Sequence, residues 1–129
     1  MGLFNKLFSS SSDSKETKTL PWIPLTKMEQ LQEIETKSNT KTQVIFKHST
    51  RCGISRMVLK QFEADFYLTE NHLDIYFLDL LNYREISNEI ANKFQVMHES
   101  PQLLVVKNGE TVAYESHGGI NSLDLSNYI

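Results

Sequence analysis

Hydrophobic residues along the chain follow two spacings, and the shorter spacing marks the strands. β-Branched and aromatic residues run together at 43–47 and 73–80, and again at 103–107 and 111–114 on either side of an Asn-Gly pair. Such runs predict strands, and Asn108-Gly109 predicts a tight hairpin between the last two. Segment 21–25 predicts a short strand at a sheet edge, because its two prolines do not fit a central strand.

The longer spacing, of three and four residues, marks helices between these strands. The first predicted helix begins at a capping box formed by Thr26 and Glu29. Its apolar face consists of Met28, Leu31 and Ile34. A second helix begins near Cys52. The apolar positions of this second helix are Ile54, Met57, Val58, Phe62 and Phe66.

Two more helices are predicted further along the chain. Asn82 and Glu85 are the expected caps of a third helix, whose apolar face consists of Ile86, Ile90 and Phe94. A last helix is expected after Asn121 or Ser122, with Asp124 in its first turn. The resulting order is β-α-β-α-β-α-β-β-α. Strands that alternate with helices predict an α/β fold with a mainly parallel central sheet, to which the final hairpin adds antiparallel strands.

Composition divides the chain into a short N-terminal segment, 1–19, and one domain, 20–129. Residues 9–19 include five serines and no apolar side chain, which predicts a flexible linker. Before them, Leu3, Phe4, Leu7 and Phe8 stand at helical spacing. Two interpretations stay open for this start: a frayed terminus, or a short amphipathic contact with a membrane or a partner.

Charge and cysteine content exclude several classes of protein. A net charge of −3 argues against a general nucleic-acid binder. With one cysteine the chain forms no internal disulfide, which argues against a secreted, disulfide-stapled scaffold. The sequence contains neither a secretory signal pattern nor an apolar stretch long enough to cross a membrane. We therefore expect a soluble protein of the cytoplasm.

Cys52 is the candidate reactive group, because it falls where a strand ends and a helix begins. The free N–H groups and the helix dipole stabilise an anion at that position, and a cysteine thiolate is such an anion. A free cysteine is also commonly a small buried hydrophobe. The neighbouring residues favour reactivity over burial, since they are polar or charged: Ser49, Thr50, Arg51 and Ser55.

Basic residues surround this cysteine in the sequence. No acidic residue occurs between Glu35 and Glu63, a span that holds six cations: Lys37, Lys41, Lys47, Arg51, Arg56 and Lys60. This distribution favours both a thiolate and the docking of an anionic partner.

Two further features complete the candidate site. Ser55 lies three residues after Cys52, where a dithiol oxidoreductase has its second cysteine. A hydroxyl cannot attack a mixed disulfide, although it can donate a hydrogen bond to a thiolate. Ser100-Pro101 directly precedes the strand at 103–107. A proline there indicates a fixed turn, cis or trans, that would bring an unpaired backbone edge towards the sulfur.

These motifs resemble the thioredoxin fold, and more closely the monothiol bacilliredoxins of the YtxJ-like family. The resemblance rests on FKHSTRCGIS, SPQLLVVKNGETVAYESH and the opening segment PWIPL, and it extends from about Leu20 to the C-terminus. It implies a cytoplasmic protein of bacteria that use bacillithiol. By position, Cys52 would be the nucleophile, Ser55 the substituted resolving position and Pro101 a cis-proline. Gly53 departs from the many thioredoxin-like motifs that place proline after the first cysteine.

The resemblance also implies a reaction. Cys52 would remove bacillithiol from mixed disulfides on client proteins, and a second thiol would regenerate it, with bacillithiol as co-substrate and no bound cofactor or metal. Bacillithiol bears carboxylates, which basic side chains would hold. The expected substrate-binding residues are Lys47, Thr50, Arg51, Gly53, Arg56, Ser100 and Pro101.

Two other functions stay open. Cys-Gly-Ile-Ser is also similar to the Cys-Gly-Phe-Ser of monothiol glutaredoxins that carry iron–sulfur clusters, although the prolines of that family's loop are missing. A redox-sensing adaptor, reaching a partner through its N-terminus, is the other alternative. The four histidines, His48, His72, His98 and His117, lack the spacing of a zinc site. His48 and His117 are candidates for a proton partner of the sulfur.

Overall fold

A computed structural model describes residues 20–129 of the chain, so the expectations for the N-terminal segment 1–19 lie outside the described residues. The elements, in chain order, are β2 (Trp22–Pro24), α2 (Glu29–Lys37), β3 (Thr42–His48), α3 (Gly53–Asp65), β4 (Leu73–Asp79), α4 (Arg84–Lys93), β5 (Gln102–Lys107), β6 (Glu110–Ser116) and the 3-10 helices η1 (His117–Ser122) and η2 (Leu125–Tyr128).

The strands form one mixed sheet in the order β2-β4-β3-β5-β6. β3 is parallel to β4 and antiparallel to β5, and β5 is antiparallel to β6. Asn108 and Gly109 both have positive φ, as the tight turn between β5 and β6 requires. The predicted α/β class and the combination of parallel strands with a final antiparallel hairpin are confirmed.

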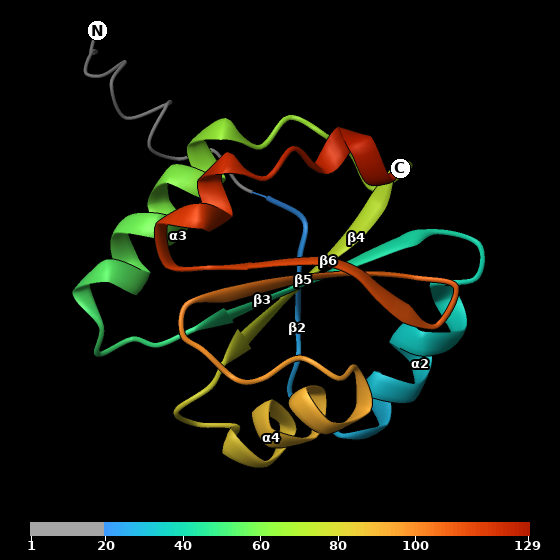
Figure 1. Ribbon diagram of the computed structural model, residues 1–129, viewed down its shortest axis with the longest axis horizontal. Helices are drawn as coiled ribbons and strands as arrows, with labels where there is room; N and C mark the ends of the chain where they lie inside the picture. The colour runs from blue at the N-terminus through green and yellow to red at the C-terminus, as the bar shows by residue number, and fades with distance from the viewer. Residues whose placement is uncertain (1–19) are drawn as a thin grey trace, which may run out of the picture.

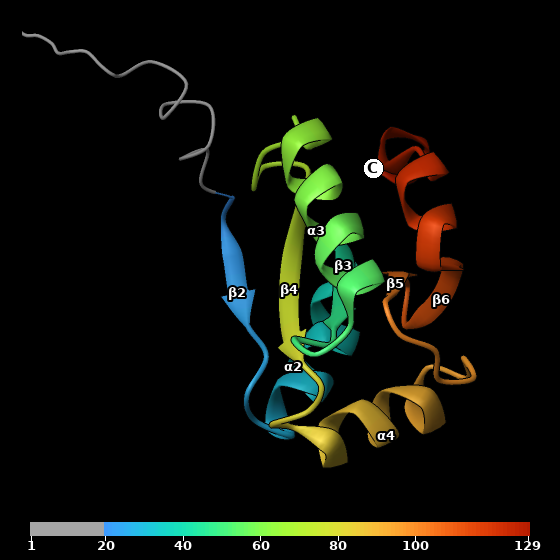
Figure 2. The same ribbon diagram turned by 90° about the vertical axis from the view of Figure 1, so that its left-hand side faces the viewer.

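Helices cover both faces of this sheet (Figures 1 and 2). α3 and the C-terminal 3-10 helices lie on one face, above a core that includes Phe46, Phe62 and Leu103. α2 and α4 lie on the other face, above a core that includes Ile45 and Leu104. Because both faces are buried, all seven residues of β3 are buried, and the sheet rigidly positions whatever follows its carboxyl end.

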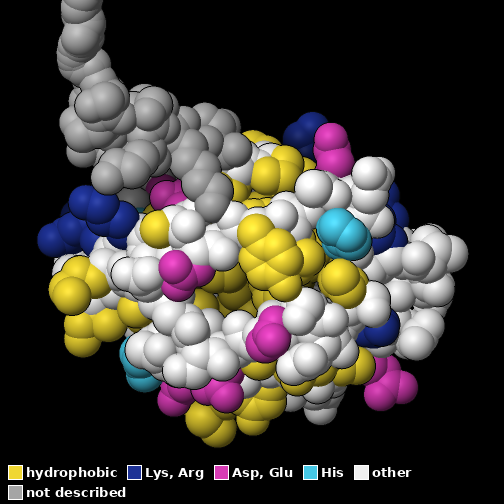
Figure 3. Space-filling model, turned by 90° about the horizontal axis from the view of Figure 1, so that it is seen from above, with side chains coloured by type: hydrophobic (Ala, Val, Ile, Leu, Met, Phe, Trp, Pro, Cys, Tyr) yellow, Lys and Arg dark blue, Asp and Glu magenta, His cyan; other side chains and the backbone are white. Residues whose placement is uncertain are grey.

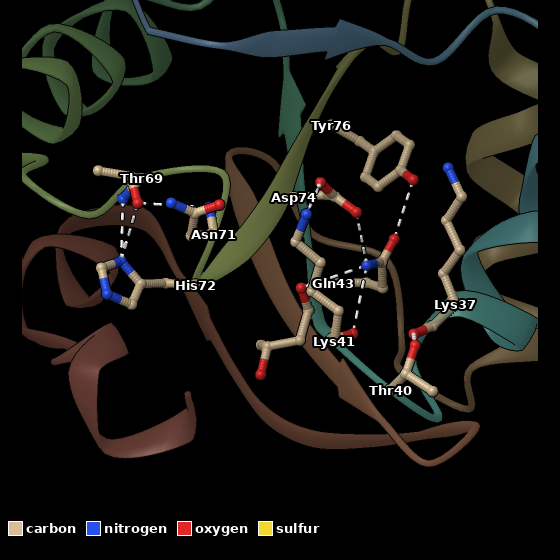
Figure 4. Close-up of polar contacts among 10 residues, drawn as sticks. Lys37, Thr40, Lys41, Gln43, Thr69, Asn71, His72, Asp74 and Tyr76 are labelled. Carbon is tan, nitrogen blue, oxygen red and sulfur yellow. Dashed lines mark hydrogen bonds and ion pairs between the residues drawn. The ribbon is translucent and has the colours of Figure 1, made fainter.

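A polar network occupies the opposite, amino end of β3 (Figure 4). Tyr76 Oη donates to Gln43 Oε1 at 2.9 Å, and Gln43 Nε2 donates to Asp74 Oδ2 at 2.9 Å. Asp74 also forms an ion pair with Lys41, with 3.0 Å between Nζ and Oδ1. Burial, with the nearby Asp74 and Glu33 carboxylates, raises the pKa of Tyr76 to about 12, so its hydroxyl stays a donor.

Both predicted helix caps are wrong. Helix α2 starts at Glu29 without a side-chain cap, and the Gln30 Oε1 instead accepts from the N–H groups of Thr26 and Lys27. Helix α4 starts one residue after Tyr83, also without a side-chain cap, and Asn82 Nδ2 donates to Asp79 Oδ2 at 2.7 Å. In each case the hydrogen bonds near the helix start differ from those of the predicted capping box.

The predicted last helix is also corrected. Two 3-10 helices replace it, and the first begins at His117, before the expected start. Leu123 has an extended backbone between them, and the Asp124 side chain accepts from Ser126 N, a bond that stabilises a local turn. The segment is anchored at its end, where the Thr42 hydroxyl donates to the Tyr128 carbonyl.

Three residues expected on apolar helix faces point to solvent. Met28 of the first predicted helix is 42% exposed, and Ile54 and Met57 of α3 are 56% and 73% exposed. The buried face of α3 includes Ser55, Val58 and Phe62. Its first turn therefore presents apolar side chains outwards, next to Cys52.

Figure 3 views the molecule from the α3 side and shows hydrophobic side chains gathered in the middle of that face. Phe66, Leu68, Ile120 and Leu123 help to line a pocket of about 90 Å³ between the carboxyl end of α3 and the C-terminal 3-10 helices. Since Cys52 lies at the other end of α3, this pocket is separate from the candidate site.

Candidate active site

Cys52 is the N-cap residue of α3. Its backbone is extended, its N–H donates to Ser49 O at 3.2 Å, and its carbonyl accepts from Arg56 N at 3.1 Å. Local hydrogen bonds thus close the loop after β3, and the N-terminus of α3 lies at the cysteine, which is half-buried. The first turn of α3 contains no acidic residue, so nothing in it opposes the positive end of the helix dipole.

Ser55 lies one turn further along α3 and is fully buried, although its polar side chain predicts a surface position. Its Oγ accepts from Ser49 N at 3.1 Å and lies 2.8 Å from His48 Nδ1. The hydroxyl is therefore engaged with the end of β3. These two bonds hold the first turn of α3 against the strand that precedes it.

His48, the last residue of β3, becomes part of the site through this contact. Sequence reasoning named it only as one of two histidines that can approach the sulfur, and its place in FKHST, four residues before the cysteine, was the available signal. Its ring is 5.4 Å from that of Phe77, between centroids. Burial lowers the pKa of His48; Asp79 and Glu63 oppose this effect and Arg56 adds to it.

Asp79 is the cross-strand neighbour of His48 in the parallel β3–β4 pair. One carboxylate oxygen, Oδ2, accepts from Asn82, whereas Oδ1 is buried and has no hydrogen-bond partner. Ser55 is therefore bonded to His48, and the nearest residue to His48 on the neighbouring strand is a carboxylate.

Pro101 follows a cis peptide bond from Ser100. It directly precedes β5, whose first residue, Gln102, pairs with Lys47 of β3. The cis-proline therefore lies beside the end of the strand that leads to Cys52. Pro101 O accepts from His117 N at 2.9 Å, while Ser100 Oγ is buried without a partner.

Besides Ser100 and Pro101, the expected substrate-binding residues divide into two groups. Thr50, Arg51, Gly53 and Arg56 are exposed around the start of α3, where Arg56 Nη1 donates to Thr50 O at 3.1 Å. Lys47 differs from them, because it is fully buried on the α2–α4 side of the sheet, 3.4 Å from Gln102 Oε1. Burial lowers the pKa of Lys47 to about 8.

Within residues 20–129, no cluster of three or more His, Cys, Asp or Glu side chains is placed to hold a metal ion. In the same part of the chain, no helix combines the length and the apolar character needed to cross a membrane.

The fold is that of a thioredoxin-like redox protein, in which the one cysteine lies at the N-terminus of α3. A solved structure described as having a thioredoxin fold is 34% identical, covers 83% of this chain and 92% of its own, and superimposes with a TM-score of 0.69. Two thioredoxins share the fold. That of Schistosoma mansoni is 18% identical, has a TM-score of 0.60, and covers 84% of this chain and 98% of its own. That of Malassezia sympodialis is 19% identical, has a TM-score of 0.58, and covers 85% of this chain and 84% of its own.

The family is narrower than the fold. Residues 23–125 match the family described as monothiol bacilliredoxin BrxC. The chain belongs to this family, as its sequence motifs predicted.

Proposed function

We propose that the protein is a monothiol thiol–disulfide oxidoreductase that removes bacillithiol from mixed disulfides on proteins. The observation that carries this proposal is the placement of the chain's one thiol at the N-terminus of α3, beside the strand end that Pro101 flanks. Membership of the bacilliredoxin family supports bacillithiol as the small thiol.

The reaction consists of two thiol exchanges. The Cys52 thiolate attacks the bacillithiol sulfur of the client's mixed disulfide; the S–S bond to the client breaks, and the client leaves as a thiolate that takes a proton from solvent. Cys52 now holds bacillithiol in a disulfide. Because Ser55 cannot act as a resolving thiol, an external thiol must attack the bacillithiol sulfur and release Cys52 as a thiolate.

Arg51 and Arg56 are the cations placed to attract the carboxylates of bacillithiol. Both side chains are exposed near the thiol, and Arg56 is positioned by its bond to Thr50. Lys47 is less suited to this task because it is buried. We therefore assign docking mainly to the arginines, with Thr50, Gly53, Ser100 and Pro101 shaping the surface around the sulfur.

This function requires bacillithiol as co-substrate and no resident cofactor. Its partners are bacillithiolated client proteins and a reducing thiol, and we expect it to operate in the cytoplasm, where bacillithiol is the working thiol in the bacteria that the family resemblance implies. The exposed Ile54 and Met57 beside Cys52 provide apolar surface for contact with a client protein.

The experiment that tests the proposal is an intact-mass measurement of reduced protein after brief exposure to bacillithiol disulfide or glutathione disulfide. We expect one adduct, formed faster with bacillithiol, and none with Cys52→Ser. A second arm uses a bacillithiolated client and measures its released thiol. Absence of an adduct with either disulfide, in a folded protein, would refute the proposal.

Arg51→Glu tests the docking step. We expect slower adduct formation with bacillithiol disulfide and a flatter dependence of the rate on salt, because the local attraction for carboxylates is lost. Lys60→Glu, also exposed on α3 but two turns beyond the cysteine, is the matched control for net charge. Equal rates of adduct formation in wild type and Arg51→Glu would show that Arg51 does not contribute to docking.

A further inference from the structure

The hydrogen bonds of Ser55 leave one proton whose direction matters. A serine hydroxyl has one O–H donor and two acceptor lone pairs. The N–H of Ser49 uses one lone pair of Ser55 Oγ. The contact with His48 Nδ1, at 2.8 Å, has either direction, depending on whether Nδ1 carries a proton.

The two directions have different consequences for Cys52. If Nδ1 is bare, the Ser55 hydroxyl must donate to it, and its only proton is committed. If Nδ1 carries a proton, Oγ accepts from both Ser49 and His48, and the hydroxyl proton is free for a third group. The candidate for that third group is the thiolate of Cys52, the N-cap residue of α3, which stands three residues before Ser55.

We propose that His48 is a positioning residue for Cys52: a proton on His48 Nδ1 turns the Ser55 hydroxyl towards the thiolate, and loss of that proton turns it away. Both the Nδ1–H form of the neutral ring and the imidazolium act in this way. Because coupling between two sites is reciprocal, a thiolate at Cys52 also favours the proton on Nδ1. The inference deepens the proposed function, on which it rests for the role of the thiolate.

Several charged groups face His48 and set where it titrates. Asp79 of β4 and Glu63 of α3 favour the imidazolium, whereas Arg56 of α3 and the burial of the ring disfavour it. Burial is the largest of these effects, so the imidazolium forms only at acidic pH. We therefore expect the coupling to appear as a second inflection, at acidic pH, in a plot of the Cys52 alkylation rate against pH.

The experiment measures the alkylation rate of Cys52 with iodoacetamide, an uncharged reagent, between pH 4 and 9. Wild type should show two inflections. Ser55→Ala should lose the acid-side inflection and react about tenfold more slowly at pH 6, as expected for one lost hydrogen bond to a charged group. His48→Leu has no ring nitrogen to accept the hydroxyl proton, so the Ser55 hydroxyl stays free for the thiolate; this variant should lose the inflection and keep the faster rate. His48→Asn keeps a neutral amide donor near the Nδ1 position and should likewise keep the faster rate with a single inflection.

The double variant His48→Leu/Ser55→Ala separates this relay from a direct effect of the ring. We expect it to react at the rate of Ser55→Ala, because His48 acts only through Ser55. A double variant clearly slower than Ser55→Ala would overturn the proposal, and so would a single-inflection wild-type profile that His48→Leu leaves unchanged. Equal losses in His48→Asn and His48→Leu would also overturn it, since they would indicate packing alone.

A second measurement keeps the wild-type ring. The ¹⁵N resonances of His48 report its tautomer and titration, and Cys52→Ala should shift them towards the bare Nδ1 form at pH 8. In a Ser55→Ala background this shift should shrink at least several-fold; a shift of full size there would refute the relay. None of these readouts uses bacillithiol. A protein with the expected alkylation profile but no bacillithiol adduct would therefore fail only the proposed function.

Discussion

Polar side chains are buried at both ends of strand β3, and their hydrogen-bonding groups are more completely paired at one end than at the other. At the amino end, Gln43 joins Tyr76 and Asp74 in a network that Lys41 completes with an ion pair. At the carboxyl end, the Lys47 ammonium has one long bond of 3.4 Å, and Asp79 Oδ1 accepts none.

The difference separates a structural network from a functional one. Fully paired buried polar groups stabilise and rigidify a fold, whereas incompletely paired ones lower stability and are found where chemistry needs them. The second kind lies at the end of β3 that leads to Cys52, and Ser100, which precedes the cis-proline, likewise has a buried Oγ without a partner. We therefore expect changes at the amino end to affect stability, and changes at the carboxyl end to affect reactivity.

The largest effect on stability should come from Gln43→Leu. This change removes the partners of Tyr76 and Asp74 and leaves both polar groups under-satisfied in the interior. The free energy of unfolding in urea should fall by about 3 kcal/mol. Gln61→Leu is the control, because Gln61 bonds only to Asp65 on the exposed surface of α3. The rate of Cys52 alkylation in the folded variant should stay within about twofold of wild type, since a fold-wide loss of cysteine reactivity would contradict the division between the two ends.

Lys47→Met should change stability in the opposite direction, because we expect it to raise the free energy of unfolding. The pKa of Lys47 is about 8 in the folded protein against 10.5 for the exposed side chain, so the unfolded state binds more protons between these values. Wild-type stability therefore rises with pH between 8 and 10.5, and the full penalty applies below pH 8. At neutral pH the variant should be more stable by roughly 2 kcal/mol, after the lost bond to Gln102 is allowed for.

The control for this prediction is Lys60→Met, at an exposed position of α3. Its stability difference from wild type should be small and independent of pH. Urea unfolding of the three proteins at pH 7, 9 and 10 gives the comparison: the advantage of Lys47→Met should narrow as pH rises. An advantage that is constant across this range would mean that folding does not lower the pKa of Lys47.

The sequence allowed much of this architecture to be predicted, for identifiable reasons. The strand runs, the Asn108-Gly109 turn and Ser100-Pro101 are local signals, and each specifies its own backbone. The burial of Lys47 was not predictable in this way, because both faces of β3 are covered and residue alternation then contains no information about exposure. The His48–Ser55 bond depends on where a strand end meets the first turn of the next helix.

The same reasoning explains the wrong caps. The local pattern of Thr26 and Glu29 satisfied the rule for a capping box, but Gln30 reaches the same backbone groups from within the helix. Likewise, the outward positions of Ile54 and Met57 interrupt an apolar spacing that continues correctly at Val58 and Phe62. Near Cys52, exposed apolar residues are compatible with contact to client proteins, so a periodicity that assumes burial fails there.

The smallest effect on stability, and the sharpest test of the carboxyl end, should come from Asp79→Asn. The amide keeps an oxygen for the bond from Asn82 and removes a buried, unpaired charge-bearing oxygen, so stability should change by less than about 1 kcal/mol. Asp79 raises the pKa of His48, so its neutralisation should lower that pKa and move the acid-side inflection of Cys52 alkylation to lower pH. Glu63→Gln, which removes a weaker contribution of the same sign, should move it less. If Asp79→Asn instead alters stability by several kcal/mol and leaves the inflection in place, Asp79 belongs with the structural network at the other end of β3, and the contrast between the two ends is wrong.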